Sequence, residues 1–173
     1  MARALPTTGR SGHRKVGVVW QANPGNRFLP HRSMRVQDLT PLVQLEGIDL
    51  VNLQSSSEGR ELARFAADAI DPLQAPLTLD EFAAALAATD VTVSVDTMAA
   101  HCAGALGRPV LVMLTDAPAW YWGVGGDKCR WYPSARLFRR SAGADWASAV
   151  EAVAAVLRGG RTEPHSIFGH GAA

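Results

Sequence analysis

Residues 91–109 read VTVSVDTMAAHCAGALGRP, and this stretch decides the fold. Its first five residues alternate valine with small hydroxyl residues, which is typical of a strand buried on both faces of a parallel sheet. Asp96 and Thr97 follow, and both are preferred residues at the start of a helix. We therefore predict a short helix over residues 98–106, ended by Gly107.

The junction between this strand and this helix has the character of an anion site. Thr97 and His101 are four residues apart and so share one face of the helix. The unpaired N–H groups of the first turn and the positive end of the helix dipole point out of the sheet, where a phosphate or pyrophosphate fits. The alternative is that Asp96 or Thr97 only caps the helix and that His101 is an ordinary polar residue. The glycines match neither GxGxxG nor a P-loop, so the junction alone leaves both interpretations open.

Composition favours a single soluble domain. The chain has 173 residues, 47% of them hydrophobic, and a net charge of +1. Basic and acidic residues are interspersed, which argues against nucleic acid as the main partner, and no apolar stretch is long enough to span a membrane. Cys102 and Cys129 lack the spacing of a redox or zinc motif, which suits a reducing compartment. We expect a cytoplasmic protein.

Strand and helix signals alternate along the chain, which predicts an α/β fold. With right-handed crossovers this gives a three-layer Rossmann-like domain, an open parallel sheet of about five to six strands flanked by helices, with ligands at the carboxyl ends of the strands. We expect strands at residues 16–20, 48–53, 69–71, 91–95, 110–114 and 136–138, and helices at 36–45, 58–67, 79–88, 98–106 and 145–157.

The predicted domain covers residues 15–158. Residues 1–14 are basic and free of acidic residues, and we expect a disordered linker there rather than a transit peptide. Residues 159–173 are expected to form a flexible tail.

The segment VSVDTMAAHCAGALGRPV resembles the donor-site motif of heptosyltransferase-like glycosyltransferases, especially the glycosyltransferase domains that follow tetratricopeptide repeats in bacteria. Other segments agree with these domains in the same order, and the resemblance spans residues 15–157. These segments are KVGVVWQANP, VNLQ, TLDEFAAALAATD, WYPSARLFRR and DWASAV.

The resemblance implies the GT-B architecture, in which two Rossmann-like halves face each other across a cleft. This chain resembles the C-terminal, nucleotide-sugar-binding half, and the acceptor-binding half has no counterpart before Lys15. We therefore expect a glycosyltransferase donor domain that takes a nucleotide-diphosphate sugar as donor substrate, needs no cofactor, and is incomplete as an isolated chain.

The resemblance also assigns roles around the motif. Asp96 and His101 are the expected catalytic residues, with Asp96 facing the hydroxyl groups of the donor sugar. Thr97, the backbone amides of Met98 and Ala99, and His101 are expected to hold the diphosphate. Negative charge develops on the departing diphosphate, so hydrogen-bond donors fixed there stabilise the transition state. No DxD motif or His/Cys ligand cluster is present, and we expect a metal-independent reaction with no metal site.

Further substrate contacts are expected in two loops. Arg27, Arg32 and Ser33 follow the first strand, and the last two lie where the family keeps an Arg-Ser pair. Gln54, at the end of the second strand, resembles a glutamine placed near the nucleotide. The alternative for the two arginines is a solvated loop charge.

A group of aromatic residues leaves two interpretations open. They fasten loops to the core, or they stack on a sugar or pack against the absent half. The second function class is accordingly a non-catalytic nucleotide-sugar-binding or partner-docking module, whose partner is an acceptor-binding half or a tetratricopeptide-repeat region on another chain. The aromatic residues are Trp120, Tyr121, Trp122, Trp131 and Tyr132.

Overall fold

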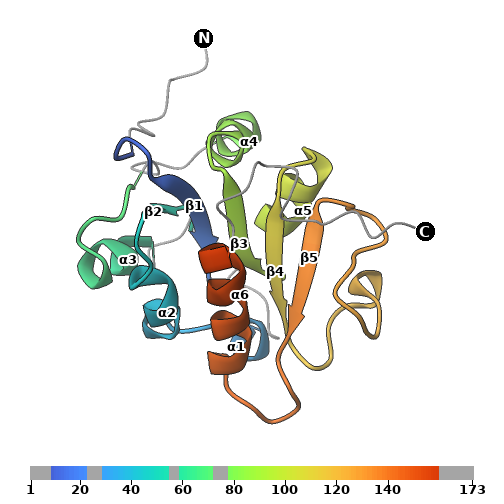
Figure 1. The fold of residues 1–173 in the computed structure, drawn as a ribbon. Coiled ribbons are helices and arrows are strands. Elements are labelled where there is room, and N and C mark those ends of the chain that lie inside the picture. Colours follow the sequence, from blue (N-terminus) through green and yellow to red (C-terminus); the bar gives the residue numbers. More distant parts are fainter. Residues whose placement is uncertain (1–8, 23–28, 55–58, 72–77, 160–173) are drawn as a thin grey trace.

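Five parallel strands form one open, twisted sheet in the order β2-β1-β3-β4-β5 (Figure 1). The structure is a computed structural model and describes residues 9–22, 29–54, 59–71 and 78–159. The parallel sheet that the alternation of signals predicts is confirmed. The strands are β1 (Arg14–Val19), β2 (Ile48–Asn52), β3 (Val91–Val95), β4 (Val110–Leu114) and β5 (Ala135–Arg139).

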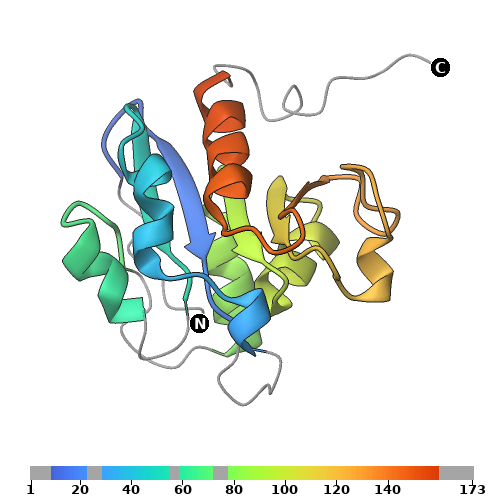
Figure 2. The same cartoon turned by 90° about the horizontal axis from the view of Figure 1, so that it is seen from below.

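Helices cover both faces of the sheet and make the three layers (Figures 1 and 2). Helices α2, α3 and α6 pack with η1 on one face, while α4 and α5 pack on the other. The helical segments are α1 (Leu29–Arg32), η1 (Val36–Leu39), α2 (Thr40–Val43), α3 (Gly59–Phe65), α4 (Leu79–Ala87), α5 (Met98–Ala105), η2 (Trp120–Trp122) and α6 (Ala147–Gly159).

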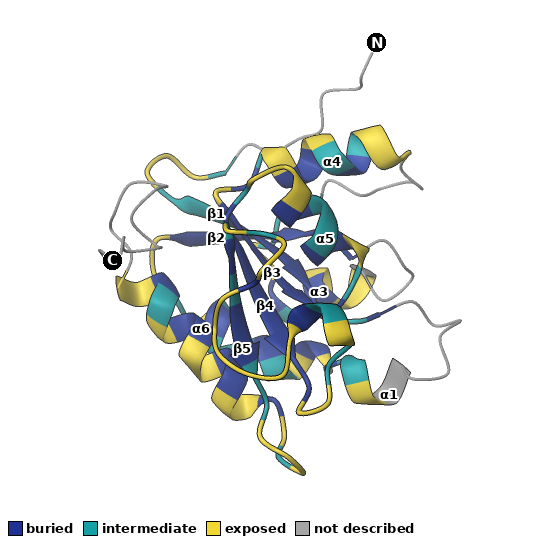
Figure 3. Cartoon of the chain, turned by 90° about the vertical axis from the view of Figure 1, so that its right-hand side faces the viewer, coloured by how far each residue is buried: buried dark blue, intermediate teal, exposed yellow. Residues whose placement is uncertain are grey.

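The sheet separates two hydrophobic cores. Side chains of a strand alternate between its faces, so Leu111 and Met113 of β4 enter one core while Val110, Val112 and Leu114 enter the other. Every residue of β2, β3 and β4 is buried, as expected for strands covered on both sides, and the exposed surface belongs to the outer helix faces and the loops (Figure 3).

Two of the expected elements are wrong in extent. The helix predicted over residues 36–45 is a 3-10 turn, η1, followed by the short α2. Pro41 lies in the first turn of α2, and because proline has no N–H group it begins a new helical turn and cannot continue the preceding one. The strand predicted at residues 69–71 is a single bridge between Ile70 and Val51.

Local sequence features fix two of the helix ends. The Thr78 hydroxyl accepts a hydrogen bond from the Glu81 amide at 3.3 Å, and the Glu81 carboxylate accepts one from the Thr78 amide at 2.9 Å, which forms a capping box at the start of α4. Gly107, just beyond α5, has φ +65°, a conformation that glycine adopts without strain.

The described residues before β1 contact the domain. The buried carboxylate of Asp49, 2% exposed, accepts hydrogen bonds from the Arg10 backbone at 2.6 Å and from Arg10 Nε at 2.8 Å. His13 Nδ1 lies 3.1 Å from the same carboxylate. Residues 9–13 are thus fastened to β2, whereas residues 1–8 and the expected tail from residue 160 lie outside the described residues. The domain boundaries stay a prediction.

No helix in the described ranges is long and apolar enough to cross a lipid bilayer.

Candidate functional site

The site expected at the end of β3 lies where the buried strand gives way to α5. Thr97 is the N-cap residue, as predicted, with an extended backbone. Its hydroxyl lies 2.9 Å from the Ser94 hydroxyl and does not cap the helix. In the described part of the chain no side chain caps the amides of Met98 and Ala99, the first two residues of α5. These N–H groups, at the positive end of the helix dipole, are therefore available to an anion.

Asp96 is the centre of the site. It is 8% exposed, and its Oδ1 accepts a hydrogen bond from Trp122 Nε1 at 2.8 Å and one from the Tyr121 hydroxyl at 3.4 Å. Its Oδ2 lies 3.1 Å from Arg32 Nη1 in an ion pair that lacks hydrogen-bond geometry, so Oδ2 accepts no hydrogen bond from any described residue. One oxygen is thus used within the protein, and the other retains hydrogen-bonding capacity.

Arg32 and Ser33 reach this region from the segment that follows β1. The Arg32 side chain, 27% exposed, pairs with Asp96 and lines a narrow crevice that Thr115 also lines. The Ser33 hydroxyl accepts a hydrogen bond from the Ala22 amide at 3.1 Å, and its carbonyl accepts one from Trp146 Nε1 at 3.0 Å. Arg32 is therefore placed at the site, while the described contacts of Ser33 hold the turn that presents it.

His101 lies inside a group of aromatic rings. It stacks on Trp122 with ring centroids 4.8 Å apart and meets the edges of Tyr121 and Tyr132 at 5.1 and 5.7 Å. Its Nδ1 lies 3.2 Å from the Tyr132 hydroxyl, and its Nε2 lies 3.9 Å from Asp96 Oδ1. The imidazole is thus fixed on several sides, with 35% of the side chain still exposed.

Sequence reasoning missed the part that three aromatic residues play in the site. Trp122, 2% exposed, fastens its loop to the core as one interpretation expected, and it also holds Asp96 and His101. Tyr121 contacts the same pair, and Tyr132 contacts His101. Burial raises the pKa of the Tyr121 hydroxyl and the negative charge of Asp96 raises it further, so Tyr121 remains a hydrogen-bond donor. The signal for these roles was their place in the loop after β4, at the carboxyl edge of the sheet.

This loop is itself held in place by Arg139 of β5. Arg139 Nη2 donates to the Trp122 carbonyl at 2.8 Å, and Nε donates to the Gly126 carbonyl at 3.2 Å. Its guanidinium satisfies loop carbonyls, which positions the aromatic residues over the site.

Gln54 is buried in a clamp between the ends of β1 and β2. Its Oε1 accepts hydrogen bonds from the amides of Trp20 and Gln21, at 3.2 and 3.0 Å, and its Nε2 donates to the Gln21 carbonyl at 3.2 Å. The amide group thus fixes the start of the loop after β1, and its contact with a nucleotide stays a prediction. Arg27 lies outside the described residues.

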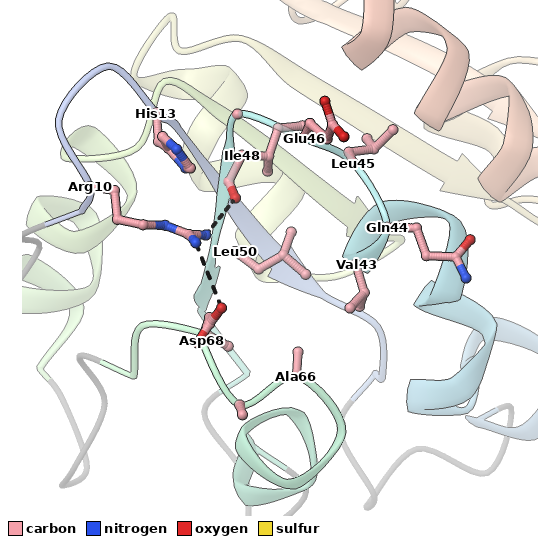
Figure 4. A pocket seen from close by; sticks show the side chains of 13 residues that line it. Arg10, His13, Val43, Gln44, Leu45, Glu46, Ile48, Leu50, Ala66 and Asp68 are labelled. Carbon is pink, nitrogen blue, oxygen red and sulfur yellow. Dashed lines mark hydrogen bonds and ion pairs between the residues drawn. The ribbon is translucent and has the colours of Figure 1, made fainter.

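A more spacious hollow, of about 550 Å³, lies at the opposite end of the sheet (Figure 4). Arg10 reaches across it, donating to the Ile48 carbonyl at 3.4 Å and pairing with Asp68 at 3.6 Å. It borders the amino end of β2, whereas Asp96, His101 and Arg32 gather beyond the carboxyl ends of the strands. None of the predicted site residues that the structure describes lines this hollow.

The combined chemistry at the carboxyl edge suits an anion with hydroxyl groups beside it. Helix amides and Arg32 supply positive potential, His101 supplies a ring nitrogen, and Asp96 Oδ2 supplies an acceptor. Among the described residues there is no cluster of three or more His, Cys, Asp or Glu arranged to hold a metal ion.

Known proteins are similar to this chain in sequence and in fold. The chain is 29% identical over 151 residues to protein FlbA of Caulobacter vibrioides, an alignment that covers 83% of this chain and 25% of FlbA. It superposes on E. coli heptosyltransferase WaaC with ADP at a TM-score of 0.62 and 21% identity, covering 90% of this chain and 46% of WaaC. It also superposes on E. coli ADP-heptose LPS heptosyltransferase II at 0.55 and 20% identity, covering 77% and 40%.

The solved structures confirm the Rossmann-like fold, and the chain spans less than half the length of each of these relatives. The sequence pattern of glycosyltransferase family 9 (heptosyltransferase) matches residues 34–132, more than half of the chain and a range that includes the strand-helix junction and the aromatic loop. The chain therefore belongs to glycosyltransferase family 9, the heptosyltransferase family.

Proposed function

We propose that this chain is the donor-binding part of a glycosyltransferase and holds a nucleotide-diphosphate sugar at the start of α5. The observation that carries the proposal is the first turn of that helix, whose amides no described side chain caps and which follows Asp96, the residue that Arg32 and His101 both approach. Membership of the heptosyltransferase family and the superposition on WaaC with ADP support the binding of a nucleotide sugar.

In this proposal the diphosphate lies at the N-terminal end of α5. The amides of Met98 and Ala99 and the Thr97 hydroxyl donate to phosphate oxygens, and Arg32 supplies positive charge. Negative charge grows on the diphosphate as the bond to the sugar breaks. Hydrogen-bond donors that the fold already holds in place stabilise that charge without reorganisation, which lowers the activation barrier. Such a mechanism requires no metal ion.

Asp96 is proposed to contact the sugar. Its Oδ2 accepts no hydrogen bond from a described residue, but it is buried beside Arg32, so a sugar hydroxyl can reach it only when the Arg32 side chain shifts. Its Oδ1 is held by Trp122 at 2.8 Å, which fixes the orientation of the carboxylate. Gln54 and Ser33 support the surrounding loops, and Arg27 is proposed to lie near the phosphates.

A thermal-shift series with ADP-, UDP- and GDP-sugars tests donor binding and identifies the base. We expect one of the three nucleotides to raise the melting temperature of the wild-type chain, because a ligand that binds the folded state alone stabilises it. The nucleoside diphosphate of that donor, without its sugar, should produce most of the same rise in melting temperature. The absence of a shift with all three would contradict the proposal.

A second candidate function is a partner-docking module without turnover. The observation that favours it is the exposure of Trp120 and Trp131, at 80% and 59%, on the same loop that covers the site. The partner would be an acceptor-binding half or a tetratricopeptide-repeat region on another chain. Hydrolysis or transfer of a nucleotide sugar by the purified chain alone would decide against this alternative.

A further inference from the structure

We infer that Tyr132 is a positioning residue for His101: its hydroxyl donates to Nδ1 and so keeps the imidazole proton on Nε2, directed toward the N-terminal end of α5. The inference rests on the proposed function, because it assigns that Nε2–H group to a phosphate oxygen of the donor. Tyr132 touches His101 and not the proposed ligand, so its effect on binding passes through the ring.

The two nitrogens of His101 face different chemistry. Nδ1 lies 3.2 Å from the Tyr132 hydroxyl, which can donate or accept. Nε2 lies 3.9 Å from Asp96 Oδ1, and an ionised carboxylate can only accept. The arrangement that satisfies both sides has a proton on Nε2 and a bare Nδ1 that accepts from Tyr132.

The Nε2 proton remains available to a ligand. At 3.9 Å the Asp96 carboxylate attracts the Nε2–H group but is too distant for a hydrogen bond. Asp96 Oδ1 already accepts from Trp122 at 2.8 Å and from Tyr121 at 3.4 Å. A phosphate oxygen at the first turn of α5 would therefore be the hydrogen-bond acceptor for Nε2–H.

Packing holds Tyr132 in this position. Gly104 lies three residues after His101 and so on the same face of α5. A Cβ atom at Gly104 would lie 2.5 Å from Tyr132 Cγ and 2.8 Å from Cδ1, a collision with the rigid ring. The absence of a side chain at Gly104 thus lets the tyrosine ring lie directly against the helix, with its hydroxyl at the imidazole.

The test compares wild type with Tyr132→Phe, which removes only the hydroxyl. Nitrogen-15 NMR of the unliganded full chain, at a pH of about 8.5 where an ordinary histidine is neutral, reports which ring nitrogen of His101 carries the proton. The His101 signals are assigned by their loss in His101→Ala. We expect an Nε2–H tautomer in wild type and a mixture of the two tautomers in Tyr132→Phe. Trp131→Phe, an aromatic substitution at the neighbouring exposed position, should keep the wild-type signature.

Gly104→Ala provides a second variant that keeps the hydroxyl but displaces the ring, and it should also give mixed tautomers. Calorimetric titration with ADP, UDP and GDP supplies an independent readout. For the nucleotide that binds, Tyr132→Phe should raise Kd by about fivefold, which corresponds to the loss of one hydrogen bond.

A wild-type His101 with its proton on Nδ1 would overturn the inference, as would a Tyr132→Phe chain with unchanged tautomer and unchanged Kd. Failure of the proposed function has a different signature. In that case no nucleoside diphosphate binds wild type, while the tautomer measurement on the unliganded chain still decides the role of Tyr132.

Discussion

The guanidinium of Arg32 lies 3.1 Å from the carboxylate of Asp96, so a residue that follows β1 is tied to one that follows β3. The two strands are neighbours in the sheet, and the pair joins their carboxyl ends. Each partner limits the motion of the other. Arg32 is thereby held beside the first turn of α5 before any ligand arrives, which lowers the entropic cost of binding an anion there.

Asp96→Asn should destabilise the chain. The neutral amide cannot pair with Arg32, and it leaves a guanidinium that is three-quarters buried without a counter-charge. We expect the free energy of unfolding to fall by about 2 kcal/mol, measured by urea denaturation. The matched control is Asp127→Asn, which removes an exposed pair with Arg136 and should cost less than about 0.5 kcal/mol. Equal losses in the two variants would count against a central role for Asp96.

Gly104→Ala should destabilise the chain although alanine is the better helix former. Helix propensity alone favours alanine by about 1 kcal/mol. The collision with the Tyr132 ring outweighs that gain, and we expect a net loss of about 1–3 kcal/mol in a urea titration. Gly159→Ala, at the end of α6 with no atom of a described residue within 4 Å of the added Cβ, should be neutral or slightly stabilising. Similar behaviour of both variants would refute the close packing of Tyr132 on α5.

Gln54→Ala tests whether this glutamine is a structural clamp. The substitution leaves the amides of Trp20 and Gln21 without their shared acceptor, one of them fully buried. Because a buried unpaired donor is costly, the melting temperature should drop by an amount that corresponds to about 2–3 kcal/mol. Gln44→Ala, at an exposed position, is the control and should change little. A variant with wild-type stability and weakened nucleotide affinity would show instead that Gln54 acts on the ligand.

Asp49 predicts how stability depends on pH. Burial acts to raise the pKa of its carboxyl group, but hydrogen bonds and charge from Arg10, with a hydrogen bond from His13, outweigh burial and lower it. The folded pKa is thus below the unfolded one, so the unfolded state binds more protons in acid. The contribution of the Asp49 charge to the free energy of unfolding is therefore fully present above the unfolded pKa of about 4. It is lost as the pH falls through the folded pKa.

Urea titrations of wild type and Asp49→Asn between about pH 3 and pH 7 measure this contribution. The variant should be less stable at neutral pH, and the gap should narrow as the pH falls below about 4. Asp68→Asn, at an 83% exposed side chain, should follow the wild-type curve. A gap that stays constant with pH would contradict the role assigned to the Asp49 charge.

The fold could be predicted from the sequence where a local pattern coincides with its tertiary setting. The valine alternation before Asp96 predicts a buried strand, and Gly107 predicts the end of α5. The structure confirms both. The helix predicted over residues 36–45 runs through Pro41, whose missing N–H group divides it into η1 and α2.

The site could be predicted only in part because its geometry depends on contacts between distant segments. Local spacing identified the helix start at Thr97 and the face it shares with His101. The residues that contact Asp96 and His101 come from a loop about 25–35 positions further along the chain. No local pattern predicts the hydrogen bond between Trp122 and Asp96 or the one between Tyr132 and His101. Likewise, the order of residues 52–54 does not reveal that the Gln54 side chain turns back onto β1.

The most direct test of the account is calorimetric titration of nucleoside diphosphates into the wild-type chain and into a Thr97→Ala, His101→Ala double variant. We predict that wild type binds ADP, UDP or GDP and that the double variant binds the same nucleotide at least about tenfold more weakly, a loss of about 1.4 kcal/mol, with the fold intact by circular dichroism. Equal affinity in both chains, or no binding of any of the three by wild type, would contradict a diphosphate site at the start of α5.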